Sequence, residues 1–196
     1  MTCLGTSIMF AFLPDILQHC APAVHPITLS AIVRQESGGN PLLIHDNRTG
    51  QTYRPTTPVN AAALASTLMR QGDSIDLGLG QINSKNLSRL GLDLFSVFNP
   101  CRNLAAVQTV LIDNWKRTRG DMRQTLSLYN TGKPDSRAGA SYAAHIYAKA
   151  NSPIPAHPIA YTFAFTSVSL PMNVEANESA AVSSLKPRAN TLITRW

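Results

Sequence analysis

The sequence predicts a mainly α-helical domain with a small irregular or β-like insert and a flexible C-terminal tail. Apolar residues recur at helical spacing in several segments, each bounded by capping residues or glycines. One segment, residues 74–83 (SIDLGLGQIN), alternates apolar and polar residues but contains two glycines, so it does not predict one continuous strand. Prolines interrupt the chain from Asn151 onward. We therefore expect the domain at residues 15–150 and a Pro/Ser/Ala-rich, mostly disordered tail at residues 151–196.

Residues 1–14 allow two interpretations. Residues 4–13 form an apolar run as long as the core of a signal peptide, but neither lysine nor arginine precedes it. The alternative is that residues 12–20 form the first packed helix of the domain. Neither the length nor the flanks of the run predict a stable membrane span.

The segment LSAIVRQESGGNP, residues 29–41, predicts a helix with a glutamate on its apolar face. Thr28 is the expected N-cap, and Glu36 follows Leu29 by seven positions, on the face expected to be buried. Two glycines and a proline then end the helix. Burial and the carboxyl end of the helix dipole both disfavour a charged carboxylate, so we expect a raised pKa, which suits a general acid. The alternative is a glutamate at the exposed edge of the helix.

The remaining elements follow from turn and capping residues. Residues 42–58 predict an irregular loop or a short hairpin. Further helices are expected at residues 60–71 (capped by Asn60), 99–118 (Asn99 followed by Pro100), 121–132 (capped by Asp121) and 139–150.

Two places in this outline offer polar groups for a ligand. Gly78 and Gly80 allow the backbone to approach a neighbour closely, and the amides of Gln81 and Asn83 can bind sugar hydroxyls and N-acetyl groups. Tight packing of a turn explains this pattern equally well. The pair Tyr129-Asn130 ends a helix and either caps it or reaches into a cleft.

The composition narrows the classes of partner and of chemistry. A net charge of +6 and a pI of about 9.6 favour an anionic partner. The basic residues are scattered, without interleaved aromatic residues, so nucleic acid is not expected. Glu36 is the only glutamate among the nine acidic residues of positions 1–150, which leaves few candidates for acid–base catalysis.

Three cysteines leave the redox state open. Cys20 and Cys101 each precede a predicted helix and can link two helix starts in an oxidising compartment, which leaves Cys3 over. The alternative is three reduced cysteines, two of them buried as small apolar groups. The sequence contains no CxxC motif or Cys/His cluster, so we expect neither a metal site nor a cofactor.

Four elements occur in order: ESGGNP (residues 36–41), GLGQIN (residues 78–83), YNTG (residues 129–132), and a helix with Tyr142 and Tyr147. Together they resemble the soluble lytic transglycosylases, which share the goose-type lysozyme fold. The flanking sequences His25-Pro26, His45-Asp46-Asn47 and Asp76-Leu77 are similar to those of the transglycosylases that accompany type IV secretion systems. The resemblance covers about residues 15–150.

The resemblance implies a lysozyme-like fold and a cleft that binds peptidoglycan glycan strands. Glu36 matches the family's single catalytic glutamate. The residues that the resemblance and the turn chemistry place in the glycan cleft are Ser37, Gly80, Gln81, Asn83, Tyr129, Asn130 and Tyr147. Members of the secretion-associated group also have cysteines near Cys20 and Cys101, which implies a disulfide.

The expected reaction is cleavage of the β-1,4 bond between N-acetylmuramic acid and N-acetylglucosamine, with a 1,6-anhydro product. The expected setting is the periplasm, where the enzyme would open the wall locally for a type IV secretion or conjugation apparatus, with components of that apparatus as further partners. The export signal in the sequence is weak. One alternative is a hydrolytic muramidase, in which Asp46 or Asp76 activates water. Another is a non-catalytic peptidoglycan-binding assembly factor.

Overall fold

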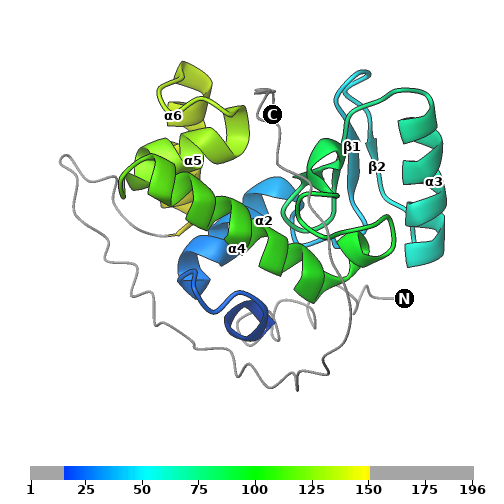
Figure 1. Ribbon diagram of the computed structural model, residues 1–196, viewed down its shortest axis with the longest axis horizontal. Coiled ribbons are helices and arrows are strands. Elements are labelled where there is room, and N and C mark those ends of the chain that lie inside the picture. The colour runs from blue at the N-terminus through cyan, green and yellow to red at the C-terminus, as the bar shows by residue number, and fades with distance from the viewer. Residues whose placement is uncertain (1–15, 151–196) are drawn as a thin grey trace, which may run out of the picture.

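The computed structural model describes residues 16–150, which form helices on one side of the molecule and a small sheet with one helix on the other (Figure 1). The interpretations of residues 1–15 and of the tail at 151–196 lie outside the described residues. Residues 16–20 are helical, and the longer helices are α2 (Pro26–Glu36), α3 (Pro58–Arg70), α4 (Pro100–Arg117), α5 (Met122–Thr131) and α6 (Arg137–Lys149). Short 3₁₀ helices, η1 and η2, span Ser84–Asn86 and Ser96–Phe98.

The β-like insert is a four-stranded antiparallel sheet with strand order β2-β1-β3-β4. Its strands are β1 (Ile44–Asp46), β2 (Thr52–Tyr53), β3 (Ile75–Leu77) and β4 (Ile82–Asn83). The predicted hairpin is therefore present, and the glycine-containing segment forms two short strands joined by a turn. The register pairs Asp76 with His45 on one side and Asn83 on the other, so these polar residues share one face. The apolar neighbours in β1 and β3 are buried on the opposite face.

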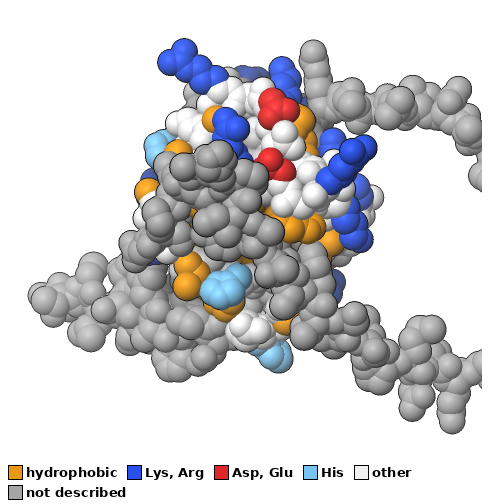
Figure 2. Space-filling model, turned by 90° about the vertical axis from the view of Figure 1, so that its left-hand side faces the viewer, with side chains coloured by type: hydrophobic (Ala, Val, Ile, Leu, Met, Phe, Trp, Pro, Cys, Tyr) orange, Lys and Arg blue, Asp and Glu red, His pale blue; other side chains and the backbone are white. Residues whose placement is uncertain are grey.

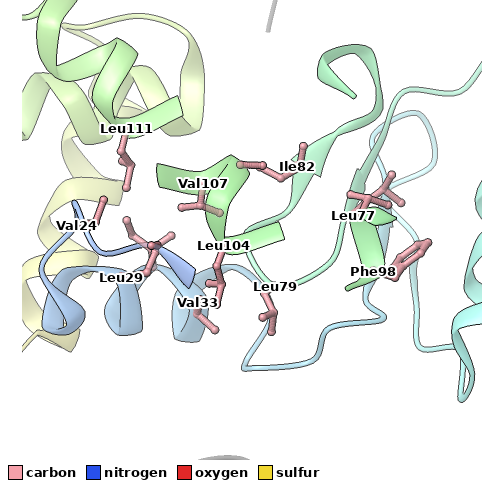
Figure 3. Packing of buried hydrophobic residues seen from close by; sticks show 14 of the residues in the cluster. Val24, Leu29, Val33, Leu77, Leu79, Ile82, Phe98, Leu104, Val107 and Leu111 are labelled. Atoms are coloured by element: carbon pink, nitrogen blue, oxygen red, sulfur yellow. The ribbon is translucent and has the colours of Figure 1, made fainter. Parts of the chain in front are cut away.

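A single hydrophobic core joins the helices to the sheet, with α4 at its centre. Figure 3 shows Leu29 and Val33 of α2 beside Leu104 of α4, with Leu77 and Phe98 on the side of the sheet. All five side chains are at least 97% buried. Because α4 contacts both groups of elements, its buried face fixes the position of the sheet relative to the helices.

Prolines move two helix starts away from the predicted positions. The α2 helix begins at Pro26 with His25 as N-cap, so the prediction of Thr28 as the N-cap was wrong. The α3 helix begins at Pro58 with Thr57 as N-cap, and the predicted cap Asn60 is instead the residue whose N–H the Thr57 hydroxyl accepts. In both cases proline takes the first helical position, where its fixed φ favours the helix and its missing N–H costs nothing.

Two predicted starts are confirmed and one is displaced. Asn99 caps α4 and Asp121 caps α5, each accepting a backbone N–H from the first turn. The α6 helix begins at Arg137, two residues before the expected Gly139, because the hydroxyl of Ser136 caps it.

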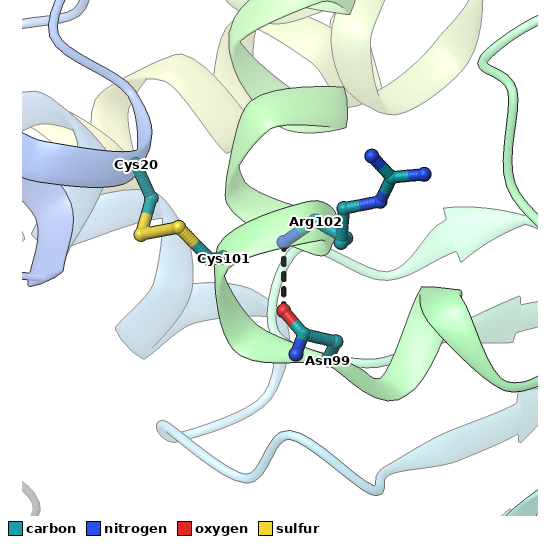
Figure 4. Close-up of a disulfide and its surroundings, with 4 residues drawn as sticks. All are labelled: Cys20, Asn99, Cys101 and Arg102. Atoms are coloured by element: carbon teal, nitrogen blue, oxygen red, sulfur yellow. Dashed lines mark hydrogen bonds between the residues drawn. A yellow bond between two sulfur atoms is a disulfide. The ribbon is translucent and has the colours of Figure 1, made fainter.

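A disulfide between Cys20 and Cys101 links residues 16–20 to the first turn of α4 (Figure 4). Their Cα atoms are 4.9 Å apart, and 81 positions of sequence separate them. Next to this bond, Gln108 of α4 accepts the backbone N–H of Ala23 at 2.7 Å. Within residues 16–150, no helix has the length and apolar character needed to cross a membrane.

Candidate active site

A cleft of about 300 Å³ lies between the polar face of the sheet and the ends of α2 and α5. Polar side chains, most of them amides, make up most of its wall, together with three aliphatic residues. The lining residues are Glu36, Asn47, Ser74, Asp76, Gln81, Ile82, Asn83, Asn86, Leu90, Val110, Tyr129 and Asn130. Amides next to aliphatic groups suit a ligand with hydroxyl and acetamido groups.

Glu36 is the last residue of α2, and its side chain enters the cleft while the preceding turns are buried. Leu29, Ile32 and Val33 are fully buried on the same helix, so the predicted position of the glutamate beside the buried face is correct. Burial of the carboxyl group raises the pKa of Glu36 from 4.5 to about 7; the hydrogen bond from Tyr142 opposes this shift, and the nearby charge of Asp76 adds to it.

Two stacked tyrosines lie behind the carboxyl group. Tyr142 of α6 donates a hydrogen bond from its phenol to Glu36 Oε1. The ring of Tyr129 stacks on that of Tyr142, with 6.4 Å between ring centroids, and its phenol donates to the carbonyl oxygen of Gly80 at 2.7 Å. Burial, with the nearby charge of Glu36, raises the pKa of both phenols well above 10, so both remain protonated donors at neutral pH.

The turn at residues 78–81 brings the backbone of the sheet against three helices. Ser37, at the end of α2, donates its hydroxyl to the carbonyl oxygen of Leu79 at 2.8 Å. Gln81 adopts a left-handed conformation, with φ of 49°, which is unfavourable for a residue other than glycine. The Gln81 amide nitrogen donates to the carbonyl oxygens of Gly78 at 2.9 Å and Leu43 at 3.3 Å. These bonds fix the turn in one conformation.

A second carboxyl group, that of Asp76, enters the cleft from β3. The amides of Asn47 and Asn83 donate to its two oxygens at 2.9 and 2.7 Å. Burial raises the pKa of Asp76, and these two hydrogen bonds and the charge of His45 oppose the rise. Asp46 has a different role: it is fully buried and accepts bonds from Thr49 and from the backbone of Arg48, so it holds the β1–β2 turn.

Five of the expected site residues line the cleft: Glu36, Gln81, Asn83, Tyr129 and Asn130. Ser37 and Gly80 do not line it, because both are buried: Ser37 binds the turn from the end of α2, and Gly80 lies within the turn with its N–H bonded to Asn103 of α4. Tyr147 packs against the hydrophobic core, and Tyr142 contacts the glutamate instead. Five positions correspond to about 140° around a helix, so the two tyrosines point in different directions and Tyr142 is the one that reaches Glu36.

The last motif contains both Tyr142 and Tyr147, but only Tyr147 was predicted to lie in the cleft, and Asn47 and Asn86 were not assigned to the cleft. Asn47 could have been found from the HDN sequence at residues 45–47, which the resemblance had already singled out and in which Asn47 directly follows β1. Among residues 16–150, no group of His, Cys, Asp or Glu side chains could hold a metal ion.

Comparison with known proteins gives matches over most of the chain. The family model described as the transglycosylase SLT domain matches residues 16–152. Protein virB1 of Agrobacterium fabrum strain C58 is 36% identical over 131 residues, which cover 64% of this chain and 54% of that protein. Protein virB1 of Rhizobium radiobacter is 32% identical over 159 residues, or 78% of this chain and 66% of that protein.

A third relative is the type IV secretion system protein virB1 of Brucella abortus, 33% identical over 125 residues, which cover 60% of this chain and 52% of that protein. The chain thus spans between about half and two thirds of the length of these curated relatives. No solved structure gives a significant match.

Proposed function

The chain belongs to the transglycosylase SLT domain family, and from this premise we propose that it is a peptidoglycan lytic transglycosylase. The proposed reaction cleaves the β-1,4 bond between N-acetylmuramic acid and N-acetylglucosamine and leaves a 1,6-anhydro-muramyl end. The observation that supports it best is the state of Glu36: a carboxyl group in the wall of a polar cleft, with a pKa of about 7.

In the first step Glu36 acts as a general acid. Its pKa leaves a large protonated fraction near neutral pH, and the proton passes to the glycosidic oxygen as the bond from that oxygen to muramyl C1 breaks. The N-acetylglucosamine leaves with a free hydroxyl, and positive charge develops at C1. The carboxyl group of Asp76 lies in the same cleft, and its carboxylate form would lower the energy of that charge.

In the second step Glu36, now a carboxylate, acts as a base. It accepts the proton of the muramyl C6 hydroxyl while that oxygen bonds to C1, which closes the anhydro ring and returns Glu36 to its protonated form. The phenol of Tyr142 donates to the carboxyl group, so it stabilises the charged state between the two steps. No water is consumed.

Hydrolysis is the second candidate, because Asp76 shares the cleft with Glu36 and could activate a water molecule. Asp46, the other candidate, is fully buried beneath the β1–β2 turn and does not line the cleft. Hydrolysis gives a reducing muramyl end in place of the anhydro end, so the product distinguishes the two reactions.

The test is mass spectrometry of the products from purified sacculi digested in ¹⁸O-labelled water. Wild type is expected to release anhydro ends without label, and Glu36→Gln is expected to release nothing. Asp113→Asn, which makes the same chemical change at an exposed surface ion pair, serves as the control that retains activity. Labelled reducing ends would instead establish the hydrolase.

We further propose that the activity opens the wall for a type IV secretion apparatus in the periplasm, because the relatives include a type IV secretion system protein. On the face drawn in Figure 2, Lys and Arg side chains project at several places, and the net charge of +6 favours approach to the anionic wall. Cells that express only Glu36→Gln are expected to lose transfer through the apparatus. Wild-type transfer in those cells would support the non-catalytic assembly factor.

A further inference from the structure

A buried asparagine of α4 binds the turn at residues 78–81, whose last residue, Gln81, lines the cleft. Asn103 is 1% exposed, and all of its amide atoms are hydrogen-bonded to backbone. Its oxygen accepts the N–H of Gly80 at 2.8 Å, and its nitrogen donates to the carbonyl oxygens of Leu77 at 3.0 Å and Val97 at 2.9 Å. One side chain thus joins β3, the 78–81 turn and the middle residue of η2.

The packing around this amide explains why the turn contains glycines. A Cβ atom at Gly78 would lie 2.5 Å from the Asn103 amide nitrogen, and φ at Gly78 is +76°. A Cβ atom at Gly80 would overlap the side chain of Val107, one turn along α4 from Asn103. Both glycines therefore permit the backbone to reach the surface of α4, where the amide can bind it.

The bonds of Asn103 extend to groups that line the cleft. Gly80 presents its N–H to Asn103 and its carbonyl oxygen to the phenol of Tyr129. The next residue, Gln81, has the left-handed φ of 49° and lines the cleft. Movement of Gly80 would therefore disturb both the bond to Tyr129 and the position of Gln81.

We propose that Asn103 is a positioning residue for the active site: it holds the 78–81 turn so that Gln81 and Tyr129 face the substrate, and does not itself touch the substrate. The proposal rests on the proposed function. The position requires an amide, because it needs one acceptor and two donors together. Leucine provides neither, and a buried carboxylate would repel the two carbonyl oxygens.

The same helix offers a matched control. Asn114 is also fully buried on α4, but its amide has no hydrogen-bond partner among residues 16–150. Asn103→Leu and Asn114→Leu thus make the same chemical change in one helix, and only the first removes bonds to the turn.

The experiment is a double-mutant cycle on soluble glycan strands, well below the melting temperature of each variant. Asn103→Leu is expected to lower kcat/KM on the order of 100-fold, as a displacement of about 1 Å in an active site does, and Asn114→Leu to change it less than about threefold. Tyr129→Phe is expected to lower kcat/KM little further in the Asn103→Leu background, because Asn103 and Tyr129 hold the two peptide groups on either side of Gly80 and loss of one bond already frees that residue. In the Asn114→Leu background, Tyr129→Phe should lower kcat/KM by the same factor as it does in wild type. If Tyr129→Phe lowers kcat/KM by its wild-type factor in the Asn103→Leu background as well, the proposal is overturned.

Hydrogen exchange supplies a readout that does not depend on activity. The Gly80 N–H is expected to exchange at least tenfold faster in Asn103→Leu than in wild type, and at an unchanged rate in Asn114→Leu. Unchanged exchange in Asn103→Leu would contradict the positioning role, whereas inactive wild type with the expected exchange would contradict only the proposed function. If Asn103→Leu does not fold, Asn103→Ser, which keeps a hydroxyl in the space, replaces it in both measurements.

Discussion

Tyr142 donates its phenolic hydrogen to the carboxyl group of Glu36, a residue 106 positions earlier in the chain. The bond joins the end of α2 to the first half of α6, two helices that pack directly on each other. The carboxyl group therefore lies between an aromatic donor on one side and the polar face of the sheet on the other.

Tyr142→Phe is expected to raise the pKa of Glu36 further. The hydrogen bond from Tyr142 lowers that pKa, so without it burial acts with less opposition. A general acid must be protonated, so the falling limb of the pH–rate profile should move to higher pH, by up to about one unit. Tyr53→Phe is the control, because the Tyr53 phenol bonds Gln51 outside the cleft. If the falling limb of the pH–rate profile does not move in Tyr142→Phe, the hydrogen bond from Tyr142 does not lower the pKa of Glu36.

Glu36→Gln is expected to stabilise the protein at alkaline pH. The folded-state pKa of about 7 lies above the ordinary 4.5, so the contribution of this group to stability is complete below pH 4.5 and is lost as the pH rises through 7. The loss in wild type should reach up to about 3 kcal/mol at pH 8 and should be absent from Glu36→Gln. Urea unfolding of both proteins at pH 4.5 and pH 8 measures it. Equal losses in the two proteins would show that Glu36 is not the group responsible.

Gly80→Ala is expected to destabilise the protein by about 1–3 kcal/mol, because its methyl group would overlap Val107 and lie 3.0 Å from the Tyr129 phenol oxygen. Val107→Ala provides space on one side. The loss of stability in the double variant should therefore be smaller than the sum of the losses in the two single variants, as thermal unfolding can measure. Additive losses would mean that the two side chains do not compete for this space.

Replacing both Cys20 and Cys101 by alanine is expected to lower the free energy of unfolding by about 4 kcal/mol. The bond closes a loop across 81 positions, and its loss restores that conformational freedom to the unfolded chain. Denaturant unfolding of the variant should match that of reduced wild type. A variant as stable as oxidised wild type would exclude a stabilising role.

The sequence predicted the mainly α, lysozyme-like fold class, which is confirmed, and the position of Glu36 beside the buried face of its helix. Local spacing and capping predicted the mainly α character and the position of Glu36, whereas the lysozyme-like fold was implied by the resemblance of four short motifs to a known family. Asn103 was not predicted, because it lies beside Leu104 on the buried side of α4 and its partners come from residues 77–97. The choice between Tyr142 and Tyr147 depended on the rotation of α6 against α2, which is set by packing across the fold.

The protein has two states of different stability, one with Cys20 and Cys101 reduced and one with the disulfide between them. In reducing surroundings the thiols stay apart, and noncovalent contacts alone hold the segment before α2 against α4. Oxidation to the disulfide then raises the free energy of unfolding by several kcal/mol. The enzyme proposed above, in its proposed periplasmic setting, would therefore reach its full stability only in an oxidising compartment.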